Sequence, residues 1–152
     1  MRYTCPVQYN LRSIGIVVNG FKQPARLDAR DSVSDLIIAP RYSRALDGIE
    51  SFSHIIVIFW LHKIRTIQRS MVKVHPRKDI SLPLTGIFAT RSPVRPNPIG
   101  ITVVKLIKRE SNILSVTGLD AIDGTPVLDI KPYIPEELSE SEIRVPTWLE
   151  KV

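Results

Sequence analysis

Residues 99–118 read IGITVVKLIKRESNILSVTG and contain two β-prone runs, Ile99–Lys108 and Asn112–Gly118, separated by a turn signal at Ser111-Asn112. β-Branched residues make up most of the first run and recur in the second, and such residues pack well on a pleated, half-buried surface. Short runs of this kind bounded by polar turn residues are typical of antiparallel β structure.

Further β-prone runs lie on both sides of this stretch. They are Leu11–Val18, Asp35–Ala39, Ile55–Leu61, Gly86–Thr90 and Pro126–Ile130. Asn19-Gly20 ends the first run with a strong turn signal. The continuous apolar run at Ile55–Leu61 favours a strand buried on both faces, although a buried helical turn would give the same pattern. Many short strands separated by glycines and prolines indicate a mainly β fold, and we expect an antiparallel β-barrel with a few short helices.

Helical signals are few, and they fall at Ser43–Gly48, His62–Val74 and Pro135–Ser141. At 152 residues with 43% hydrophobic side chains, the chain fits one domain with a substantial core. We expect this single domain to span residues 1–152, with a core at about residues 14–135 and a tail over 136–152. No apolar run approaches the roughly 20 residues of a membrane-spanning helix. The first residues also lack the pattern of a signal peptide, so a cytoplasmic protein is expected.

Metal and redox chemistry have little support in the sequence. Cys5 is the only cysteine, which excludes an internal disulfide and any Cys-x-x-Cys pair. The three histidines, His54, His62 and His75, do not show the spacing of a zinc centre, which normally takes three or four protein ligands. We therefore expect no metal site.

Positive charge is concentrated in one stretch, although the chain carries a net charge of only +6. Between His62 and Lys78 there are six basic residues and no acid; they are Lys63, Arg65, Arg69, Lys73, Arg77 and Lys78. Such a stretch can hold a phosphate backbone through salt-sensitive contacts, or it can be an ordinary solvated loop. The sequence leaves both interpretations open.

Two segments carry the polar groups best suited to a ligand site. In residues 89–100, three prolines stiffen a loop that presents Arg91 and Arg95, which suits either ligand recognition or a plain connection between strands. In residues 119–130, three carboxylates lie close together. Asp123-Gly124 is a hairpin turn signal, whereas Asp120 and Asp129 can accept hydrogen bonds, pair with a cation or take a proton.

These segments resemble a known family. The matching stretches are Phe88–Ser92, Arg95–Gly100 and Asp123–Tyr133, with a further likeness at Leu46–His54, so that the similarity spans roughly Ile14 to Pro135. They are similar to the tRNA methyltransferases that methylate N6-threonylcarbamoyladenosine beside the anticodon. The resemblance implies a β-barrel that binds S-adenosyl-L-methionine, usually as a homodimer. It also implies that this short chain lacks the extra C-terminal domain of bacterial members. No Gly-x-Gly occurs in the chain, which agrees with a cofactor fold other than the doubly wound one.

The resemblance also implies site residues. Cofactor contacts would fall on Gln23, Pro24, His62, Lys63, Arg91, Ile101, Leu119, Asp120, Ala121 and Ile122. A base such as Asp120 or Asp123 would take the departing proton, while Arg91 or Arg95 binds the threonine carboxylate or neutralises oxygen charge. Two alternatives stay open, namely methylation of another small molecule or nucleoside and a non-catalytic RNA-binding barrel.

Overall fold

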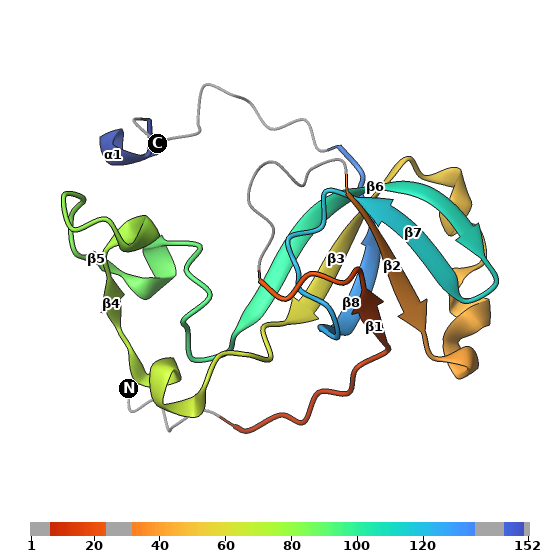
Figure 1. Cartoon of the computed structure of the whole chain (residues 1–152), viewed down its shortest axis with the longest axis horizontal. Helices are drawn as coiled ribbons and strands as arrows, with labels where there is room; N and C mark the ends of the chain where they lie inside the picture. The colour runs from red at the N-terminus through yellow and green to blue at the C-terminus, as the bar shows by residue number, and fades with distance from the viewer. Residues whose placement is uncertain (1–6, 24–31, 136–144, 151–152) are drawn as a thin grey trace.

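Six antiparallel strands close into a barrel in the computed structural model of this chain, which describes residues 7–23, 32–135 and 145–150 (Figure 1). Around the barrel the order is β1-β2-β7-β6-β3-β8. The bounds are Gly15–Val18 for β1, Val33–Ile38 for β2, His54–Trp60 for β3, Ile99–Glu110 for β6, Ile113–Thr117 for β7 and Pro126–Pro132 for β8. The predicted mainly β fold with an antiparallel barrel is therefore confirmed.

The long strand β6 holds the two halves of the barrel together. Its first part pairs with β3, from Ile99 opposite Trp60 to Lys105 opposite His54. Its second part pairs with β7, and the register shifts between Leu106 and Lys108. An irregularity of this kind bends a strand and increases its twist, which a small closed barrel requires.

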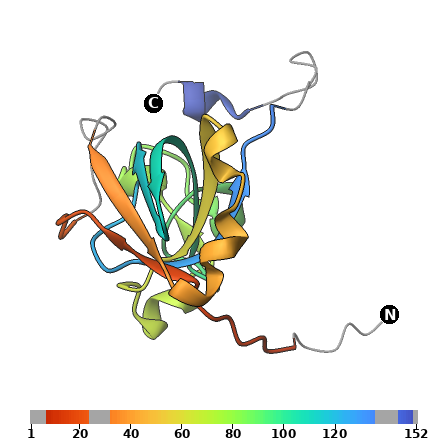
Figure 2. The ribbon, with the colours of Figure 1, turned by 90° about the vertical axis from the view of Figure 1, so that its right-hand side faces the viewer.

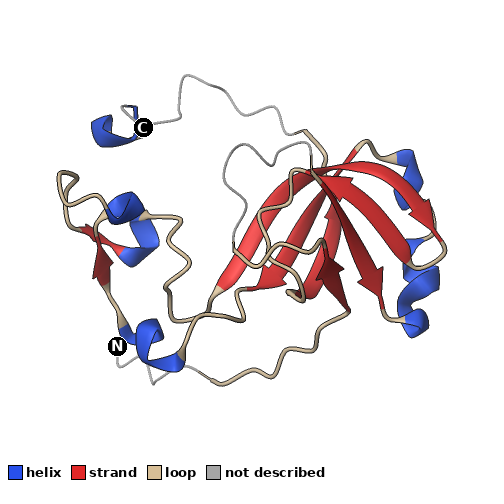
Figure 3. Ribbon diagram, viewed as in Figure 1, coloured by secondary structure: helices blue, strands red, loops and turns tan. Residues whose placement is uncertain are grey.

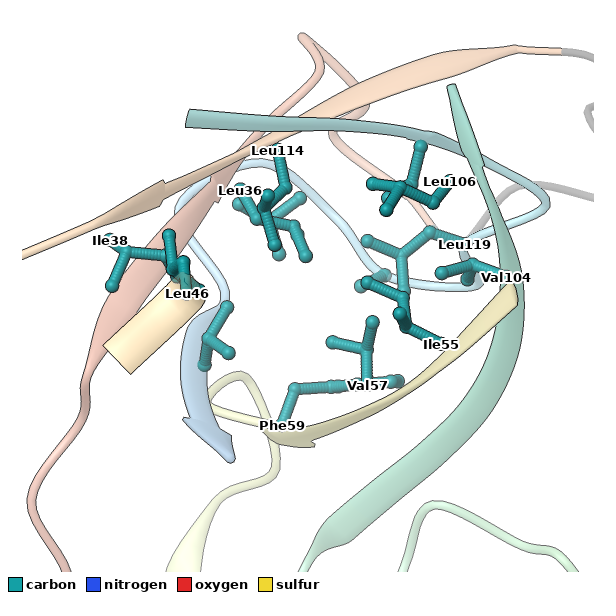
Figure 4. Packing of buried hydrophobic residues seen from close by; sticks show 14 residues of the cluster. Leu36, Ile38, Leu46, Ile55, Val57, Phe59, Val104, Leu106, Leu114 and Leu119 are labelled. Carbon is teal, nitrogen blue, oxygen red and sulfur yellow. The ribbon is translucent and has the colours of Figure 1, made fainter. Parts of the chain in front are cut away.

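The barrel core is filled by residues that alternate along the strands. Ile55, Val57 and Phe59 of β3 point inward and are buried, as are the inward residues of the other strands (Figure 4). They meet Val17, Leu36, Ile38, Val104, Leu106, Leu114, Val116 and Val127 in one cluster. Each such side chain contributes roughly 1.5–3 kcal/mol when fully removed from water.

The prediction that Ile55–Leu61 is buried on both faces was wrong. The run is a strand, but Ile56, Ile58 and Trp60 lie on the outside of the barrel and are only half-buried. No second sheet layer packs on this face in the described part of the chain, and the Arg69 guanidinium of the lobe lies over the Trp60 ring, 5.2 Å from its centre.

Residues 61–98 form an excursion from the barrel that we call the lobe. It holds the short strands β4 (Lys73–Val74) and β5 (Thr85–Gly86), which pair with each other, and three 3₁₀ turns, η4 (Thr66–Ser70), η5 (Pro76–Lys78) and η6 (Ile87–Ala89). Figure 3 shows that most of the lobe is loop and that it extends to one side of the barrel.

Two sequence predictions in the lobe were wrong. Gly86–Thr90 is not a strand, because the amide and hydroxyl of Thr90 both donate to the Ile87 carbonyl and close the 3₁₀ turn η6. His62–Val74 is not one helix. Only Thr66–Ser70 forms a helical turn, and its five residues are held by a local Arg65–Gln68 hydrogen bond.

The remaining helical turns lie away from the lobe. The 3₁₀ turns η2 (Pro40–Leu46) and η3 (Ile49–Ser51) lie against the opposite end of the barrel (Figures 1 and 2). The predicted turn at Ser43–Gly48 thus begins earlier, at Pro40, and Gly48 has φ +87° where η3 starts. One turn of α-helix, α1, covers Thr147–Glu150. The helical prediction at Pro135–Ser141 falls almost entirely outside the described residues. No helix in the described segments is long and apolar enough to cross a membrane.

Candidate functional site

Three buried residues fix the segment between β7 and β8 against the barrel. Leu119 and Ala121 are only 4% and 3% exposed and belong to the core cluster, and Thr125 is also buried. Main-chain hydrogen bonds join its end to β1, since Val17 N donates to Thr125 O at 2.9 Å and Gly124 N donates to Val17 O at 2.8 Å. The intervening Asp120 therefore sits at the surface on a segment that cannot easily move.

Asn19 fastens this segment to the barrel. Its side-chain amide donates to Ser34 Oγ at 3.0 Å and to Ala121 O at 2.9 Å, while its oxygen accepts from Phe21 N at 3.0 Å. The sequence marked Asn19-Gly20 only as a turn. Nothing local in the sequence reveals a partner more than a hundred residues away, so this contact was missed.

A further main-chain contact brings two predicted parts of the site together. Asp123 N donates to Phe21 O at 2.8 Å, which places the turn after β1 beside the segment from Leu119 to Asp123. Gln23 lies two residues beyond Phe21 and is exposed. Pro24 lies outside the described residues.

The two carboxylates proposed as bases have opposite electrostatic environments. Protein packed around the Asp120 carboxylate raises its pKa, although one side of the side chain reaches solvent. The Asp123 carboxylate instead accepts hydrogen bonds from Asn19 N at 2.9 Å and Gly20 N at 3.2 Å, which lower its pKa. Asp120 is thus the stronger proton acceptor, and Asp123 holds the turn after β1.

His62 and Lys63 begin the lobe directly after β3. Leu61 N donates to Pro98 O at 2.7 Å, so the two ends of the lobe meet there. The Nδ1 atom of His62 is buried and has no hydrogen-bond partner among the described residues. Burial, and then the charge of Lys63, lower the pKa of His62, which favours the neutral imidazole. A buried polar atom without a partner is costly and points to a group that binds there.

The strand register places the start of the lobe and the segment before β8 at one end of the barrel. Phe59, near the end of β3, lies opposite Val127, near the start of β8. The chain therefore enters the lobe close to where the segment carrying Asp120 and Asp123 enters β8. The predicted residues Leu119–Ile122, His62 and Lys63 consequently share one end of the barrel.

The proline-rich loop is held by its own arginine. Arg95 Nη1 donates to Ser92 O at 3.2 Å and to Thr90 O at 3.4 Å, and Val94 N donates to Ser92 Oγ at 3.3 Å. Arg95 therefore contributes to the stiffness of the loop. The Arg91 side chain is exposed and forms no hydrogen bond or ion pair with the described residues. The structure does not bring it into contact with the other predicted site residues.

The structure places Ile101 on β6 and Asp129 on β8. Ile101 is on the outer face of β6, opposite Ile58, and is 66% exposed. Asp129 accepts from Ile130 N at 2.9 Å and pairs with Lys131 at 2.8 Å, so its carboxylate is engaged within its own strand.

The histidines and acidic residues of the described chain do not gather into a cluster of metal ligands. Within residues 7–23, 32–135 and 145–150, no three His, Cys, Asp or Glu side chains gather as a metal site would need. His54 instead contacts the Ser53 hydroxyl at 2.9 Å, and His75 donates to Leu82 O at 2.8 Å. A surface hollow of about 570 Å³ lies between the start of β1 and the end of β2, and no candidate site residue lines it.

Comparison with known proteins identifies relatives. Residues 19–137 match the family described as tRNA-methyltransferase O N-terminal domain. A probable S-adenosyl-L-methionine-binding protein of Pyrococcus abyssi is 40% identical over 96% of this chain and 79% of its own length. A human tRNA (adenine(37)-N6)-methyltransferase is 45% identical over 67% of this chain and 23% of its own. A crystal structure of TrmO superposes with a TM-score of 0.71 and 34% identity over 91% of this chain. This chain spans 64% of that solved chain.

Proposed function

This chain belongs to the tRNA-methyltransferase O N-terminal domain family, and we propose that it is an S-adenosyl-L-methionine-dependent methyltransferase that acts on tRNA in the cytoplasm. The match of residues 19–137, which cover most of the barrel and the whole lobe, to this family supports the proposal. The names of two relatives, one for binding the cofactor and one for the tRNA reaction, support it as well. We propose that residues 1–152 form one methyltransferase-like domain whose core, at about residues 14–135, holds the site.

The residues at the lobe end of the barrel suit the cofactor. The rigid Leu119–Ile122 segment offers main-chain donors and acceptors, and Asp120 offers a carboxylate for hydroxyl groups or a cation. His62 Nδ1 is a buried polar atom that lacks a partner in the described chain. We propose that these residues hold S-adenosyl-L-methionine, with Gln23, Pro24, Lys63, Arg91 and Ile101 as further contacts.

The proposed reaction needs a base and accurate positioning. When bound, S-adenosyl-L-methionine supplies an electrophilic methyl group on a sulfonium centre. Asp120 takes the N–H proton that the substrate nitrogen releases as its bond to the methyl carbon forms and the carbon–sulfur bond breaks. Asp123 keeps the neighbouring turn in place through Asn19 N and Gly20 N. A nitrogen with a delocalised lone pair is a weak nucleophile, so alignment contributes most of the rate.

The proposed substrate is N6-threonylcarbamoyladenosine beside the tRNA anticodon. It carries a carboxylate, and Arg91 is an exposed guanidinium with no partner in the described chain. A guanidinium pairs with a carboxylate through two parallel hydrogen bonds. We propose that Arg91 binds this carboxylate and that Arg95 positions it, because Arg95 is bonded to the Thr90 and Ser92 carbonyls of the same loop.

A homodimer is the proposed assembly. Ile99, Ile101 and Val103 alternate along the outer face of β6 and are exposed, and several apolar residues of the lobe are also exposed. The most exposed of these lobe residues are Ile67, Val72, Ile80 and Phe88. Apolar surface of this extent favours a protein interface. A second copy packed on β6 would cover Ile101.

Light scattering tests the assembly with Ile101→Glu, and Val33→Glu on the outer face of β2 is the matched control because Val33 is also an exposed strand residue. We expect Ile101→Glu to yield monomers and Val33→Glu to remain dimeric. Monomeric wild-type protein would contradict the proposed dimer.

Transfer of a labelled methyl group from S-adenosyl-L-methionine to tRNA tests the activity. We expect Asp120→Asn to reduce turnover strongly. Arg91→Ala should raise the KM for both S-adenosyl-L-methionine and tRNA, while Arg44→Ala, which removes an exposed arginine from η2, should have no effect. Absence of transfer by the wild-type protein would refute the proposed function.

A further inference from the structure

The lobe is not needed to close the barrel. Its two ends meet where Trp60 pairs with Ile99, and a two-residue turn is enough to join antiparallel neighbours at such a point. The chain instead inserts residues 61–98, of which only Pro76, Ile87 and Pro98 are buried. Long connections with little packing of their own usually serve a function.

The lobe holds all of the net positive charge of the chain. It has eight Lys or Arg residues and one acid, Asp79, which gives a net charge of +7. The whole chain has 21 Lys or Arg and 15 Asp or Glu, so the remainder has 13 against 14 and a net charge of −1. The basic character of the protein is therefore a property of this one element.

Most of these cations are available to a partner. Lys63, Arg65, Lys73, Arg77 and Lys78 are exposed, and none forms a salt bridge with the described residues. The Asp79 carboxylate is occupied by Ser81, whose amide and hydroxyl donate to it at 2.9 and 2.6 Å. Arg69 differs, because its guanidinium lies 5.2 Å from the centre of the Trp60 ring and anchors the lobe to the barrel.

The lobe holds two basic residues in a backbone conformation that favours glycine. Arg77 and Lys78 have φ values of +54° and +62°. Residues other than glycine occupy this region at a cost, and such strain concentrates at functional positions. Glycine would fit both positions without strain, so the structure alone does not account for two cations there.

We propose that the outer part of the lobe docks the phosphate backbone of the tRNA, with Lys73, Arg77 and Lys78 as phosphate contacts. This inference rests on the proposed function, which supplies the tRNA. Phosphate contacts fix orientation and carry no sequence information, so they suit an element beside the site. The base of the lobe carries His62 and Lys63, and an RNA held on the outer lobe would present its nucleoside to that end of the barrel.

The test compares tRNA affinity across a series of salt concentrations. The double variant Arg77→Gly with Lys78→Gly removes two charges. Glycine also adopts positive φ without strain, so the fold should be retained. Arg44→Gln with Lys105→Gln removes the same charge from exposed positions outside the lobe. We expect the lobe variant to weaken binding roughly tenfold at about 0.1 M salt and to flatten the slope of log K against log salt by about one to two. The control should keep the wild-type slope.

Further measurements separate this inference from the proposed function. Lys73→Gln, which leaves the strained turn intact, should flatten the slope by about one. If the wild-type protein methylates tRNA and the lobe variant binds like the control, the docking surface is overturned while the proposed function stands. If the slope depends on the lobe but no methyl group is transferred, docking is supported and the proposed function fails. A wild-type protein that does not bind tRNA overturns the docking surface.

Discussion

Replacing Asn19 by alanine should damage both stability and cofactor binding. The change removes three hydrogen bonds, to Ser34 Oγ, Ala121 O and Phe21 N, at 2.9–3.0 Å. A typical hydrogen bond contributes about 1 kcal/mol, and a buried group left without a partner costs about 1–3 kcal/mol. Ser34 is only 1% exposed, so its hydroxyl loses a buried partner. We expect the free energy of unfolding to fall by about 2–4 kcal/mol.

Urea denaturation measures that loss, and calorimetry with S-adenosyl-L-methionine measures its functional consequence. Because Asn19 holds Ala121, we expect cofactor affinity to fall as well. Asn112→Ala is the control, since Asn112 bonds to the Ile38 carbonyl elsewhere on the barrel. It should reduce stability and leave affinity unchanged in the folded protein. Unchanged affinity in Asn19→Ala would refute the placement of the cofactor beside residues 119–122.

Three further substitutions follow from the structure. Gly100→Ala should destabilise the barrel by about 1–3 kcal/mol in thermal unfolding, because a Cβ there overlaps the Phe59 ring, while Gly86→Ala, with open space around it, should not. Asp120→Asn should raise stability at neutral pH and lower turnover. Burial raises the pKa of Asp120, so the ionised carboxylate destabilises the fold above that pKa. Turnover of the wild-type protein should decline as the pH falls through the pKa of Asp120, because the protonated carboxyl cannot act as a base. A flat pH–rate profile would argue against Asp120 as the base. Asp123→Asn should be less stable than the wild-type protein above the ordinary aspartate pKa, because hydrogen bonds lower the pKa of Asp123. The stability that the ionised Asp123 contributes is lost only as the pH falls through that lowered pKa. Equal stability of the two proteins at neutral pH would contradict this role of Asp123.

The strands could be predicted largely because their signals are local. β-Branched residues and flanking turns located Ile99–Lys108, and the strand continues to Glu110 because backbone pairing with Ile113 does not depend on the polar side chains. Gly86–Thr90 could not be predicted, because two hydrogen bonds from Thr90 to the Ile87 carbonyl decide between a strand and a 3₁₀ turn. The alternation of inward and outward residues in β3 could not be read from the sequence, because the outward residues are apolar as well. The barrel nevertheless leaves them half-exposed.

The candidate site could be predicted only in part for a related reason. The carboxylates at Asp120 and Asp123 were visible in the sequence, but their different roles depend on packing and on main-chain donors from another strand. Asn19 was missed because its partner Ala121 is distant in sequence. The stacking of Arg69 on Trp60 likewise depends on how the lobe folds back onto the barrel.

Mass spectrometry of nucleosides tests the proposed reaction most directly. The substrate is tRNA that carries N6-threonylcarbamoyladenosine, incubated with this protein and S-adenosyl-L-methionine bearing a deuterated methyl group. We predict that the modified adenosine beside the anticodon gains one deuterated methyl group on N6. A modified adenosine of unchanged mass, with protein that binds both cofactor and tRNA, would contradict the account.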